Sequence, residues 1–571
     1  MSSKSKIFNN AGYLIFLVFS LSIFLQCILF HLIQYGAVSF PPVKVSSLLV
    51  KASLALFIAS FSLITKRKYW LVVISAIFSI WCMAELIYYR SNNIYIERYS
   101  ILMIGNMNGV WDSILIFNKA VDWLFLLPTI IVGVFVSLFE DKKRYFSSFA
   151  IIIFVALLLN CLGCKNIHRK LECKHTKCTH RNVLNPFHKE GEKSFLGFNT
   201  EDYLRNVSVI HSFIFQVKEL ILLPFNKETY TLTEEERMLA DKFVKNYNNL
   251  TVISSRPIII LIIESFENWT ITPESTPHLY KFINENNNIL YANKMTHQAR
   301  HGVSADGQMI INTGLLPITD GATCFRFPNN EFPAISKLYN EPCLIAALSL
   351  AYWNQKFMSD SYGIKKNYVV ESWYDEDMLA KVGEIGNRHD FVMALTMTMH
   401  APFYACKEKE FPYTEGIPDE VYRYLNSVKY TDKCLGKLLN ELTNNQETRN
   451  YNIVITSDHN VLSQESRTAF NIYNKKNNLG FGEINGYIPF IIYSPQIGNK
   501  IIIEEPVFQM DIYPTLLSLT GCEDYYWKGF GVNLLENGSW NIRTIQPNEA
   551  QELSDKMIRA NYFKNIMDYN P

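Results

Sequence analysis

The first 164 residues constrain the fold most strongly, because they contain apolar stretches long enough to cross a lipid bilayer. A membrane-spanning helix needs about 17–25 predominantly apolar residues. Five stretches reach this length: Ala11–Ile33, Ser46–Thr65, Tyr69–Tyr89, Trp123–Phe139 and Ser147–Gly163. Residues 1–164 are therefore predicted to form an α-helical transmembrane bundle of about five spans.

Two of these stretches need a further argument. Ala11–Ile33 lies where a signal peptide would lie, but its apolar core exceeds the usual length of about 7–15 residues and no small-residue cleavage site follows it. We therefore expect a span that is retained. The second stretch contains Lys51, whose ammonium group has to reach the membrane interface or face the other helices of the bundle.

Basic clusters around the spans predict the orientation of the chain. Lys4 and Lys6 precede the first span, residues 66–68 separate the second and third, and residues 142–144 separate the fourth and fifth. With five spans, all three clusters fall on one side, and an excess of Lys and Arg identifies that side as the cytoplasm. The C-terminal part then lies outside the cytoplasm, whereas four or six spans would place it inside.

Eleven cysteines are distributed over the chain, and an exported location permits disulfides. Residues 161–180 contain four cysteines and three histidines, but their spacing fits no standard zinc-ligand pattern well. Disulfides or free thiols are therefore favoured there over a metal site. The C-terminal part contains five more cysteines, and the sequence does not determine how they pair.

Residues 165–252 are predicted to be a linker with two helices. Ser208–Phe225 has an amphipathic pattern that suits the membrane surface or the underside of a soluble domain. Leu232–Tyr247 begins with Thr233-x-x-Glu236, a pattern that caps the start of a helix. The linker is expected to hold the C-terminal part away from the bilayer.

Residues 253–571 are predicted to form an α/β soluble domain. Continuously apolar runs cover residues 258–266, 345–353, 391–400, 452–460 and 487–495, and helical patterns lie near residues 276–285, 419–442 and 510–521. Continuously apolar strands that alternate with helices indicate a buried, mostly parallel sheet. The net charge of +1 gives no reason to expect nucleic acid as a partner.

Polar side chains follow several of these apolar runs directly. Glu264, His400 and the pair Asp458-His459 each stand at the end of a run. Ligands of such sheets gather beyond the carboxyl ends of the strands, so we expect these side chains to lie close together. Ser304, in a loop between Gly302 and Gly307, is the hydroxyl on which they are expected to converge.

This set of groups suits a divalent metal ion and a nucleophile. Carboxylate oxygens and an imidazole nitrogen bind Zn²⁺, Mn²⁺ or Mg²⁺. A bound ion lowers the pKa of a nearby hydroxyl and polarises a phosphoryl oxygen, which suits phosphoryl chemistry. Taken singly, Glu264 is also explained as a helix cap, Asp458-His459 as a turn, and His400 as a packed core residue. Their order and their shared place at strand ends favour the metal site.

The residues resemble those of a known family. The series ESF, a Gly-flanked hydroxyl followed by LLP, WNQ, TMHAPF, SDHN and QMDIYPTLLSLTG is similar to the alkaline phosphatase–sulfatase superfamily. The membrane anchor makes the chain resemble its lipoteichoic acid synthase and phosphoglycerol transferase branch, which is related to the phosphoethanolamine transferases that modify lipid A. The resemblance covers about residues 256–535.

The resemblance implies roles for individual residues. Glu264, Ser304, Asp458 and His459 would bind one divalent ion, Mn²⁺, Zn²⁺ or Mg²⁺. Ser304 would also be the catalytic nucleophile that takes a phosphoglycerol or phosphoethanolamine head group from a phospholipid donor. The substrate-binding residues would be His400, Trp353 and Gln355. His400 would contact the phosphate or protonate a leaving oxygen, and Trp353 would line the head-group pocket.

The resemblance also implies the setting of the enzyme. It would be a multi-pass protein of the bacterial inner membrane, with its catalytic domain on the periplasmic or extracellular side. It would transfer the head group to a cell-envelope glycan or lipid acceptor.

Two positions depart from the family pattern. The synthases have a Thr followed by Ser-Asp-x-Glu where this chain has Ser304-Ala305-Asp306-Gly307-Gln308, and they favour Arg where Gln355 stands. The first departure leaves Thr313 as an alternative nucleophile, and the second removes a charge from the expected head-group pocket. His297, Arg300 and His301 are alternative phosphate contacts or surface residues.

Three other functions are alternatives to the transferase. A phosphodiesterase or phosphatase of the same fold would use water as the acceptor. A sulfatase is disfavoured, because Ser304 lacks the Pro and Arg of the Cys/Ser-x-Pro-x-Arg context and the expected set of metal carboxylates is smaller. A non-enzymatic scaffold is supported only by the two departures from the family pattern.

Overall fold

The fold is described from a computed structural model. The structure describes residues 11–36, 44–92, 95–96, 99–100, 117–139, 143–172, 204–222, 230–245, 254, 256–406, 409–412, 415–536 and 538–564. The chain forms two compact units. The first contains Met1–Arg98 and Ile114–Asn226, and the second contains Tyr99–Ser113 and Lys227–Pro571.

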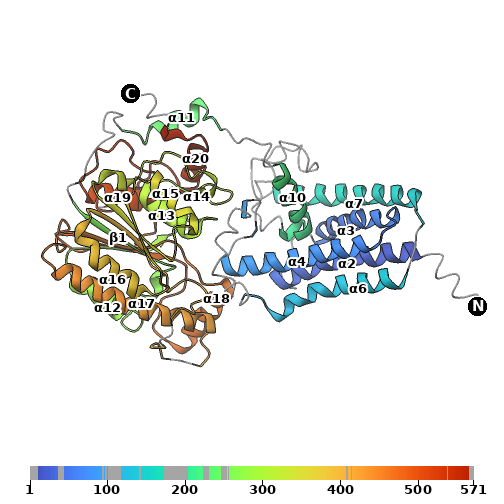
Figure 1. The fold of residues 1–571 in the computed structure, drawn as a ribbon, viewed down its shortest axis with the longest axis horizontal. Helices are drawn as coiled ribbons and strands as arrows, with labels where there is room; N and C mark the ends of the chain where they lie inside the picture. The colour runs from blue at the N-terminus through green and yellow to red at the C-terminus, as the bar shows by residue number, and fades with distance from the viewer. Residues whose placement is uncertain are drawn as a thin grey trace, which may run out of the picture. The chain divides into compact units, whose positions relative to one another are not determined.

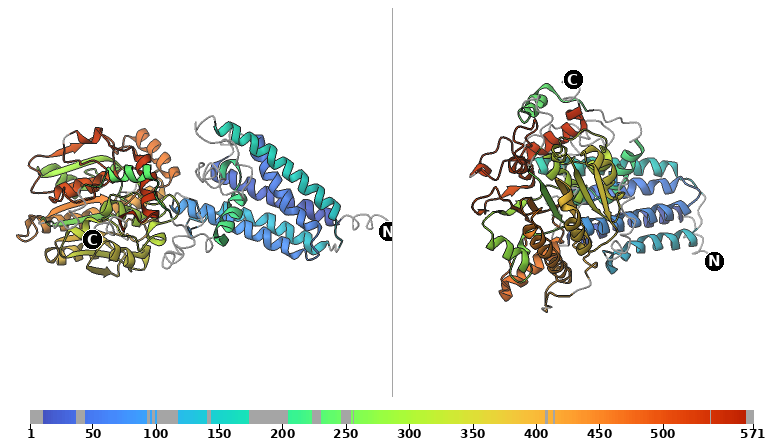
Figure 2. Two further views of the ribbon diagram at one scale, coloured as in Figure 1. Left: turned by 90° about the horizontal axis from the view of Figure 1, so that it is seen from above. Right: turned by 60° about the vertical axis from the view of Figure 1, so that its left-hand side comes forward.

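The first unit is a bundle of long apolar helices that lie side by side (Figure 2). Its helices are α2 (Ala11–Tyr35), α3 (Lys44–Ser60) with the 3-10 turn η1 (Phe61–Leu63), α4 (Tyr69–Asn92), η3 (Ala120–Phe125) leading into α6 (Leu126–Leu138), and α7 (Phe146–Glu172). Five of these segments are long and apolar enough to cross a membrane. The five predicted spans are thus confirmed, and the chain is a multi-pass membrane protein.

Several polar residues inside this bundle form hydrogen bonds with one another. Lys51 is only 2% exposed and donates from its Nζ to Ser47 Oγ over 2.6 Å, so it faces the bundle. Gln26 Nε2 donates to Ser79 Oγ over 2.9 Å, which joins α2 to α4. Such pairing lowers the cost of a polar group in hydrocarbon.

Both helices predicted between the spans and the α/β domain are present. The amphipathic one is α10 (Val209–Leu222), which belongs to the first unit, and the other is α11 (Glu234–Asp241), which belongs to the second. Thr233 Oγ1 accepts the Glu236 N–H over 3.3 Å, and Glu236 accepts the Thr233 N–H over 2.9 Å. The predicted capping box is therefore formed.

The second unit is built on one mixed, mostly parallel sheet in which helices lie over both faces (Figure 1). Its strands are β1 (Ile258–Ile263), β2 (Ile289–Thr296), β3 (Pro342–Ala347), β4 (Lys366–Val370), β5 (Phe391–Leu395), β6 (Asn452–Ser457), β7 (Ile488–Tyr493), β8 (Ile501–Ile503) and β9 (Val507–Phe508). The order is β4-β3-β5-β1-β6-β7-β2-β8, and β9 pairs with β2. Only β7 runs antiparallel to its neighbours, β6 and β2.

The helices of this unit form two layers. Over one face lie α13 (Val303–Thr313), α14 (Thr323–Arg326), α15 (Gln355–Ser361) and α19 (Ile512–Leu519), and over the other lie α12 (Pro277–Glu285), α16 (Asp375–Ile385) and α17 (Asp419–Asn444) (Figure 1). Two further helices are α18 (Gln464–Asn477) and α20 (Pro547–Arg559).

Burial on both faces explains the continuously apolar strands. All six residues of β1 are buried, and Ile259 and Leu261 pack in one core with Leu279 of α12, Val382 of α16 and Leu435 of α17. A fully buried isoleucine or leucine contributes about 1.5–3 kcal/mol. The predicted α/β fold is confirmed.

In the described part of the chain, Cys324, Cys343, Cys434 and Cys522, whose pairing the sequence left open, are free thiols. Cys161 and Cys164 at the end of the last span are free thiols as well. Cys406 Sγ lies 3.6 Å from the Asn426 carbonyl oxygen. The rest of the Cys- and His-rich segment of residues 161–180 lies outside the described residues or has no described side chains.

Candidate metal centre and nucleophile

Two neighbouring parallel strands, β1 and β6, place the acidic residues at one edge of the sheet. Ile263 at the end of β1 is in register with Ser457 at the end of β6. Glu264 and Asp458, which directly follow these two strand ends, therefore lie side by side. This placement follows from the parallel pairing, because the carboxyl ends of parallel strands meet at the same edge.

Glu264, Asp458 and His459 form a buried cluster. Each offers one ligand atom, and these atoms all lie within 4.8 Å of one another. His459 Nε2 lies 3.6 Å from Glu264 Oε1 and 3.4 Å from Asp458 Oδ2. The structure thus brings together the three groups that the sequence placed at two strand ends.

The hydrogen bonds of Asp458 leave one oxygen available to a cation. Its Oδ1 accepts the N–H of Ser265 over 2.8 Å and that of His459 over 2.9 Å. Its Oδ2 is buried and has no hydrogen-bond partner among the described residues. A buried carboxylate oxygen without a donor is costly unless an ion binds it.

The charges and the tautomer of the cluster also fit a divalent ion. Burial and the adjacent charge of Asp458 raise the pKa of Glu264. His459 Nδ1 lies 2.8 Å from the carbonyl oxygen of Asn460, which can only accept, so Nδ1 donates there and Nε2 is the ring nitrogen that faces the cluster. Within the described residues, neither carboxylate pairs with a lysine or arginine.

Ser304 lies in the first turn of α13 with its hydroxyl directed at the cluster. Its Oγ donates to Glu264 Oε2 over 3.1 Å and lies 3.4 Å from His459 Nε2. The side chain is buried, at 5% exposure. The residue predicted as nucleophile therefore shares a site with the three predicted ligands.

Two glycines allow α13 to begin at this place. A Cβ on Gly307 would lie 2.7 Å from the Asp458 Cα, so glycine is needed for the helix to pack this closely against Asp458. A Cβ on Gly302 would lie 2.1 Å from Asp306 Oδ1. Asp306 Oδ2 accepts the N–H groups of Gly302 over 2.8 Å and Arg300 over 3.0 Å, and burial raises the pKa of Asp306 to about 7.

The backbone next to Ser304 is strained. Val303 has a φ of 43°, a left-handed conformation that a β-branched residue rarely adopts. Ser265, which follows Glu264, has a φ of 56°. Such conformations cost about 1–3 kcal/mol each and concentrate at functional sites.

His400 follows β5 at the same edge of the sheet. Its Nδ1 lies 2.7 Å from the Ala401 carbonyl oxygen, so Nε2 is the ring nitrogen that this contact does not use. Burial lowers the pKa of His400. The Trp373 ring lies with its centroid 6.1 Å from that of His400, and it is a candidate substrate contact that sequence reasoning missed.

Asp375 fixes the segment that leads to His400. Its Oδ1 accepts the N–H groups of Met397 over 2.7 Å and Thr398 over 2.8 Å, and Thr398 Oγ1 donates to the Trp373 carbonyl over 3.1 Å. The Trp373 and His400 segments are thereby joined.

Two of the residues that depart from the family pattern, Gln308 and Gln355, contact each other. Gln355 Nε2 donates to Gln308 Oε1 over 3.1 Å, and Gln308 lies one helical turn after Ser304 on α13. A neutral amide pair therefore occupies the place where the family pattern has an acidic and a basic residue. The Trp353 ring, predicted to line the pocket, packs 6.3 Å from the Phe325 ring.

Thr313 is not the nucleophile of this site. It ends α13, and its Oγ1 donates to the Met309 carbonyl over 2.7 Å. At about 1.5 Å of helix rise per residue, it lies more than two turns away from Ser304.

Among the alternative phosphate contacts, His297 faces the cluster. Burial and then the neighbouring His459 lower the pKa of His297 to about 4. Arg300 instead donates from Nε to Gln551 Oε1 over 3.1 Å. Gln509, which sequence reasoning did not assign, donates from Nε2 to the Asp458 carbonyl over 2.9 Å and accepts the Gln298 N–H over 2.9 Å.

Comparisons with known families agree with this architecture. Residues 324–522 match the Sulfatase family, and residues 1–175 match the lipoteichoic acid synthase N-terminal domain. The first match covers most of the helix and strand alternation between α14 and α19, and the second covers the five spans.

Relatives with both parts are known from bacteria. Lipoteichoic acid synthase 2 of Bacillus subtilis is 23% identical over 84% of this chain and 76% of its own length. The lipoteichoic acid synthase-like YvgJ of the same organism is 24% identical over 58% of this chain, and the match spans 59% of that relative.

A solved structure of similar extent is the integral membrane lipooligosaccharide phosphoethanolamine transferase A from Neisseria meningitidis. It is 13% identical, covers 89% of this chain and 95% of its own, and superimposes with a TM-score of 0.48. With its synthase-type N-terminal spans and its sulfatase-type α/β domain, this chain resembles the lipoteichoic acid synthase and phosphoglycerol transferase branch of the alkaline phosphatase–sulfatase superfamily.

Proposed function

We propose that this chain is a metal-dependent transferase that moves a phosphoglycerol or phosphoethanolamine head group from a membrane phospholipid to a cell-envelope glycan or lipid. The observation that carries the proposal is the position of Ser304 Oγ, 3.1 Å from Glu264 Oε2 and 3.4 Å from His459 Nε2, beside an Asp458 oxygen that has no hydrogen-bond partner. The relatives named lipoteichoic acid synthase support it.

Glu264, Asp458, His459 and Ser304 would hold one Mn²⁺, Zn²⁺ or Mg²⁺ ion. Such an ion lowers the pKa of a bound hydroxyl and neutralises charge on the phosphoryl oxygens. The chain supplies a nucleophile held at a helix start, a buried site and a set of ligands that are already together.

The transfer runs in two steps through Ser304. Its Oγ gives its proton to a base and attacks the phosphorus of the donor head group, an Oγ–P bond forms, and the bond from phosphorus to the glycerol oxygen of diacylglycerol breaks. That oxygen takes the proton from the base as it leaves. An acceptor hydroxyl then attacks the same phosphorus, loses its proton to a base, and releases Ser304 Oγ, which regains a proton.

His400 is the proposed proton carrier, and Trp353 and Gln355 are proposed contacts of the head group. With Nδ1–H donated to the Ala401 carbonyl, neutral His400 presents the lone pair of Nε2. It takes the proton of the acceptor hydroxyl and, once protonated, gives a proton to a leaving oxygen.

We propose a separate role for each of the three parts of the chain. Residues 1–164 anchor it in the bacterial inner membrane, residues 165–252 link the parts, and residues 253–571 form a catalytic domain on the periplasmic or extracellular side. That side is where phospholipids of the outer leaflet and envelope acceptors meet.

The test uses the full chain in lipid nanodiscs with phosphatidylglycerol or phosphatidylethanolamine labelled in the head group. Ser304→Ala should abolish release of diacylglycerol, whereas Ser304→Thr, which keeps a hydroxyl, should retain it. Undiminished turnover in Ser304→Ala would overturn the proposal. Label that appears only in solution when a glycan or lipid acceptor is present would assign a phosphodiesterase or phosphatase of the same fold instead.

A further inference from the structure

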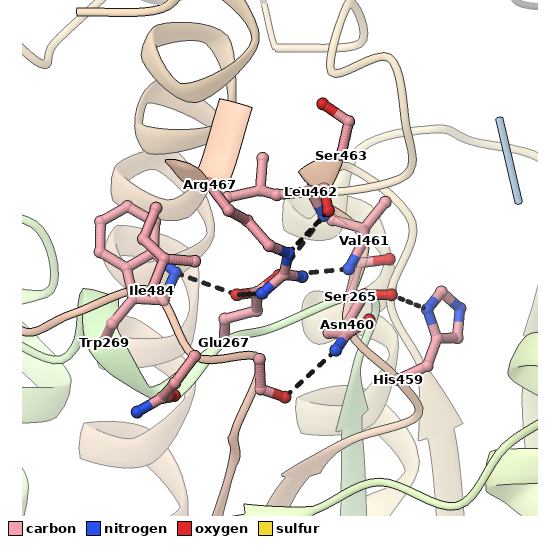
Figure 3. Close-up of polar contacts among 12 residues, drawn as sticks. Ser265, Glu267, Trp269, His459, Asn460, Val461, Leu462, Ser463, Arg467 and Ile484 are labelled. Carbon is pink, nitrogen blue, oxygen red and sulfur yellow. Dashed lines mark hydrogen bonds and ion pairs between the residues drawn. The ribbon is translucent and has the colours of Figure 1, made fainter. Parts of the chain in front are cut away.

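Another buried carboxylate, Glu267, lies near the cluster of Glu264, Asp458 and His459 and makes very different contacts. Glu267 is fully buried, and Arg467 of α18 pairs with both of its oxygens, Nη2 with Oε1 over 2.7 Å and Nη1 with Oε2 over 3.1 Å (Figure 3). Trp269 Nε1 donates to the same Oε2 over 3.1 Å. Such a two-pronged pair between arginine and a carboxylate fixes geometry as well as charge.

The pair holds the backbone that follows the metal ligands. Glu267 Oε1 accepts the N–H groups of Val461 over 3.2 Å and Leu462 over 3.4 Å. Arg467 Nε donates to the Leu462 carbonyl over 2.8 Å. This segment, between β6 and α18, is neither helix nor strand. Its backbone groups therefore form hydrogen bonds with side chains and not with a neighbouring strand or helical turn.

The same segment orients the imidazole of the cluster. His459 Nδ1 donates to the carbonyl of Asn460, the residue that precedes Val461 (Figure 3). A shift of this backbone would therefore turn the ring and move Nε2, which faces Glu264 and Asp458. Glu267 is also connected to the segment that carries Glu264. Tyr424 Oη accepts the Glu267 N–H over 2.9 Å and donates over 2.9 Å to the carbonyl of Ser265, which directly follows Glu264.

Close packing leaves the segment little freedom. Asn460 Nδ2 donates to the Gly486 carbonyl over 3.3 Å (Figure 3). Gly486 has a φ of 79°, and a Cβ there would lie 2.5 Å from Asn460 Nδ2 and 3.1 Å from Arg467 Nη1. Only glycine fits, so the guanidinium and the Asn460 side chain share one tightly filled space.

We infer that the Glu267–Arg467 ion pair is a positioning device that sets the His459 imidazole for metal binding. The inference rests on the metal site of the proposed function. Neither Glu267 nor Arg467 touches the cluster, and they act through the backbone of residues 460–462. Groups that orient a metal-binding histidine typically change metal affinity by about 10–100-fold when they are removed.

The test replaces the pair by side chains of similar volume, Glu267→Met with Arg467→Met. Removing both charges together leaves no unpaired ion, and such replacements often preserve or raise stability. The Val461 and Leu462 N–H groups nevertheless lose their acceptor. Full-length protein is titrated with Co²⁺, whose visible absorption reports ligand geometry, and the thermal midpoint is measured alongside.

A matched control removes another carboxylate–arginine pair of the same unit. Asp555 accepts the Thr319 N–H over 2.8 Å and pairs with Arg559 Nε over 2.7 Å, so it too joins a loop backbone to a helix. Asp555→Leu with Arg559→Met should leave the Co²⁺ affinity and spectrum unchanged. A second variant, Arg467→Lys, keeps a cation beside Glu267 but loses the two-pronged contact.

We expect the Met/Met variant to bind Co²⁺ about 10–100-fold more weakly with an altered spectrum, and Arg467→Lys to lose about tenfold. Wild-type affinity and spectrum in either variant would overturn the inference while leaving the metal site intact. If wild-type protein itself binds no Co²⁺, the metal site of the proposed function fails, and the inference fails with it. A loss of affinity in the control pair as large as in the Met/Met variant would also contradict a specific positioning role.

Discussion

Two sets of buried carboxylates lie close together in this protein and are compensated in opposite ways. Glu267 accepts three N–H groups and pairs with Arg467, whereas Glu264 and Asp458 face each other without a lysine or arginine in the described part of the chain. Burial raises the pKa of both glutamates. The Arg467 charge opposes that shift at Glu267, but the Asp458 charge adds to it at Glu264.

The difference separates a structural site from a chemical one. A buried charge that is paired and fully hydrogen-bonded has nothing left to bind, and it serves to hold backbone in place. A buried charge with an unused oxygen, such as Asp458 Oδ2, is stable only when something else neutralises it. The comparison therefore supports the proposal that Glu264, Asp458 and His459 bind the metal and that Glu267 and Arg467 position them.

The largest expected effect comes from removing a ligand of the open cluster. Asp458→Ala or His459→Ala should release the bound ion and lower head-group transfer by at least about 10³-fold, because the ion contributes several kcal/mol of charge stabilisation. Metal content of the purified full-length protein and turnover of labelled phospholipid measure the two effects. Full metal occupancy in both variants would show that the ligands are elsewhere.

Neutralising one glutamate from each set should affect stability differently, with a large loss for Glu267 and no loss for Glu264. Glu267→Gln leaves Arg467 buried without a charged partner, which costs about 3–5 kcal/mol whether or not metal is present. Glu264→Gln in metal-free protein removes one of two facing carboxylates and should leave stability unchanged or raise it by about 1 kcal/mol. Denaturant unfolding of the metal-free variants decides between the two signs. Equal destabilisation by both substitutions would remove the distinction drawn between the sets.

The smallest expected effect is a displacement of the pH profile. Burial lowers the pKa of His400 below its ordinary value of about 6.5, so the imidazole stays neutral as the pH falls through that value. The acid limb of the transfer rate should therefore lie below about pH 6.5 and should disappear in His400→Gln, which cannot titrate. An acid limb at or above this pH, or one that persists in the variant, would exclude His400 as the titrating base.

The sequence predicts most of the fold because burial leaves a clear pattern. The length of the apolar stretches gives the five spans, and the run at residues 258–263 gives β1, which is buried on both faces. Strands nearer the edges of the sheet were missed. In β4, Lys366 is exposed and Asn367 half-buried, and β2 interrupts its apolar residues with Asn293 and Lys294.

The sequence predicts those site residues whose location is fixed by their position at the end of a strand. Glu264 and Asp458 stand one residue beyond paired strand ends, so parallel pairing alone brings them together. The Glu267–Arg467 and Gln308–Gln355 contacts join side chains far apart in the sequence, and no local sequence pattern predicts them. Such pairs follow from tertiary packing, which a single sequence does not determine.

The most direct test of the account is to look for the head group on Ser304. Full-length protein is incubated with phosphatidylglycerol or phosphatidylethanolamine in the absence of an acceptor, quenched in acid, digested and measured by mass spectrometry. The account predicts a phosphoglycerol or phosphoethanolamine adduct on the peptide that contains Ser304, absent from Ser304→Ala and from protein stripped of metal. Turnover of the donor without an adduct, or an adduct on another residue, would contradict it.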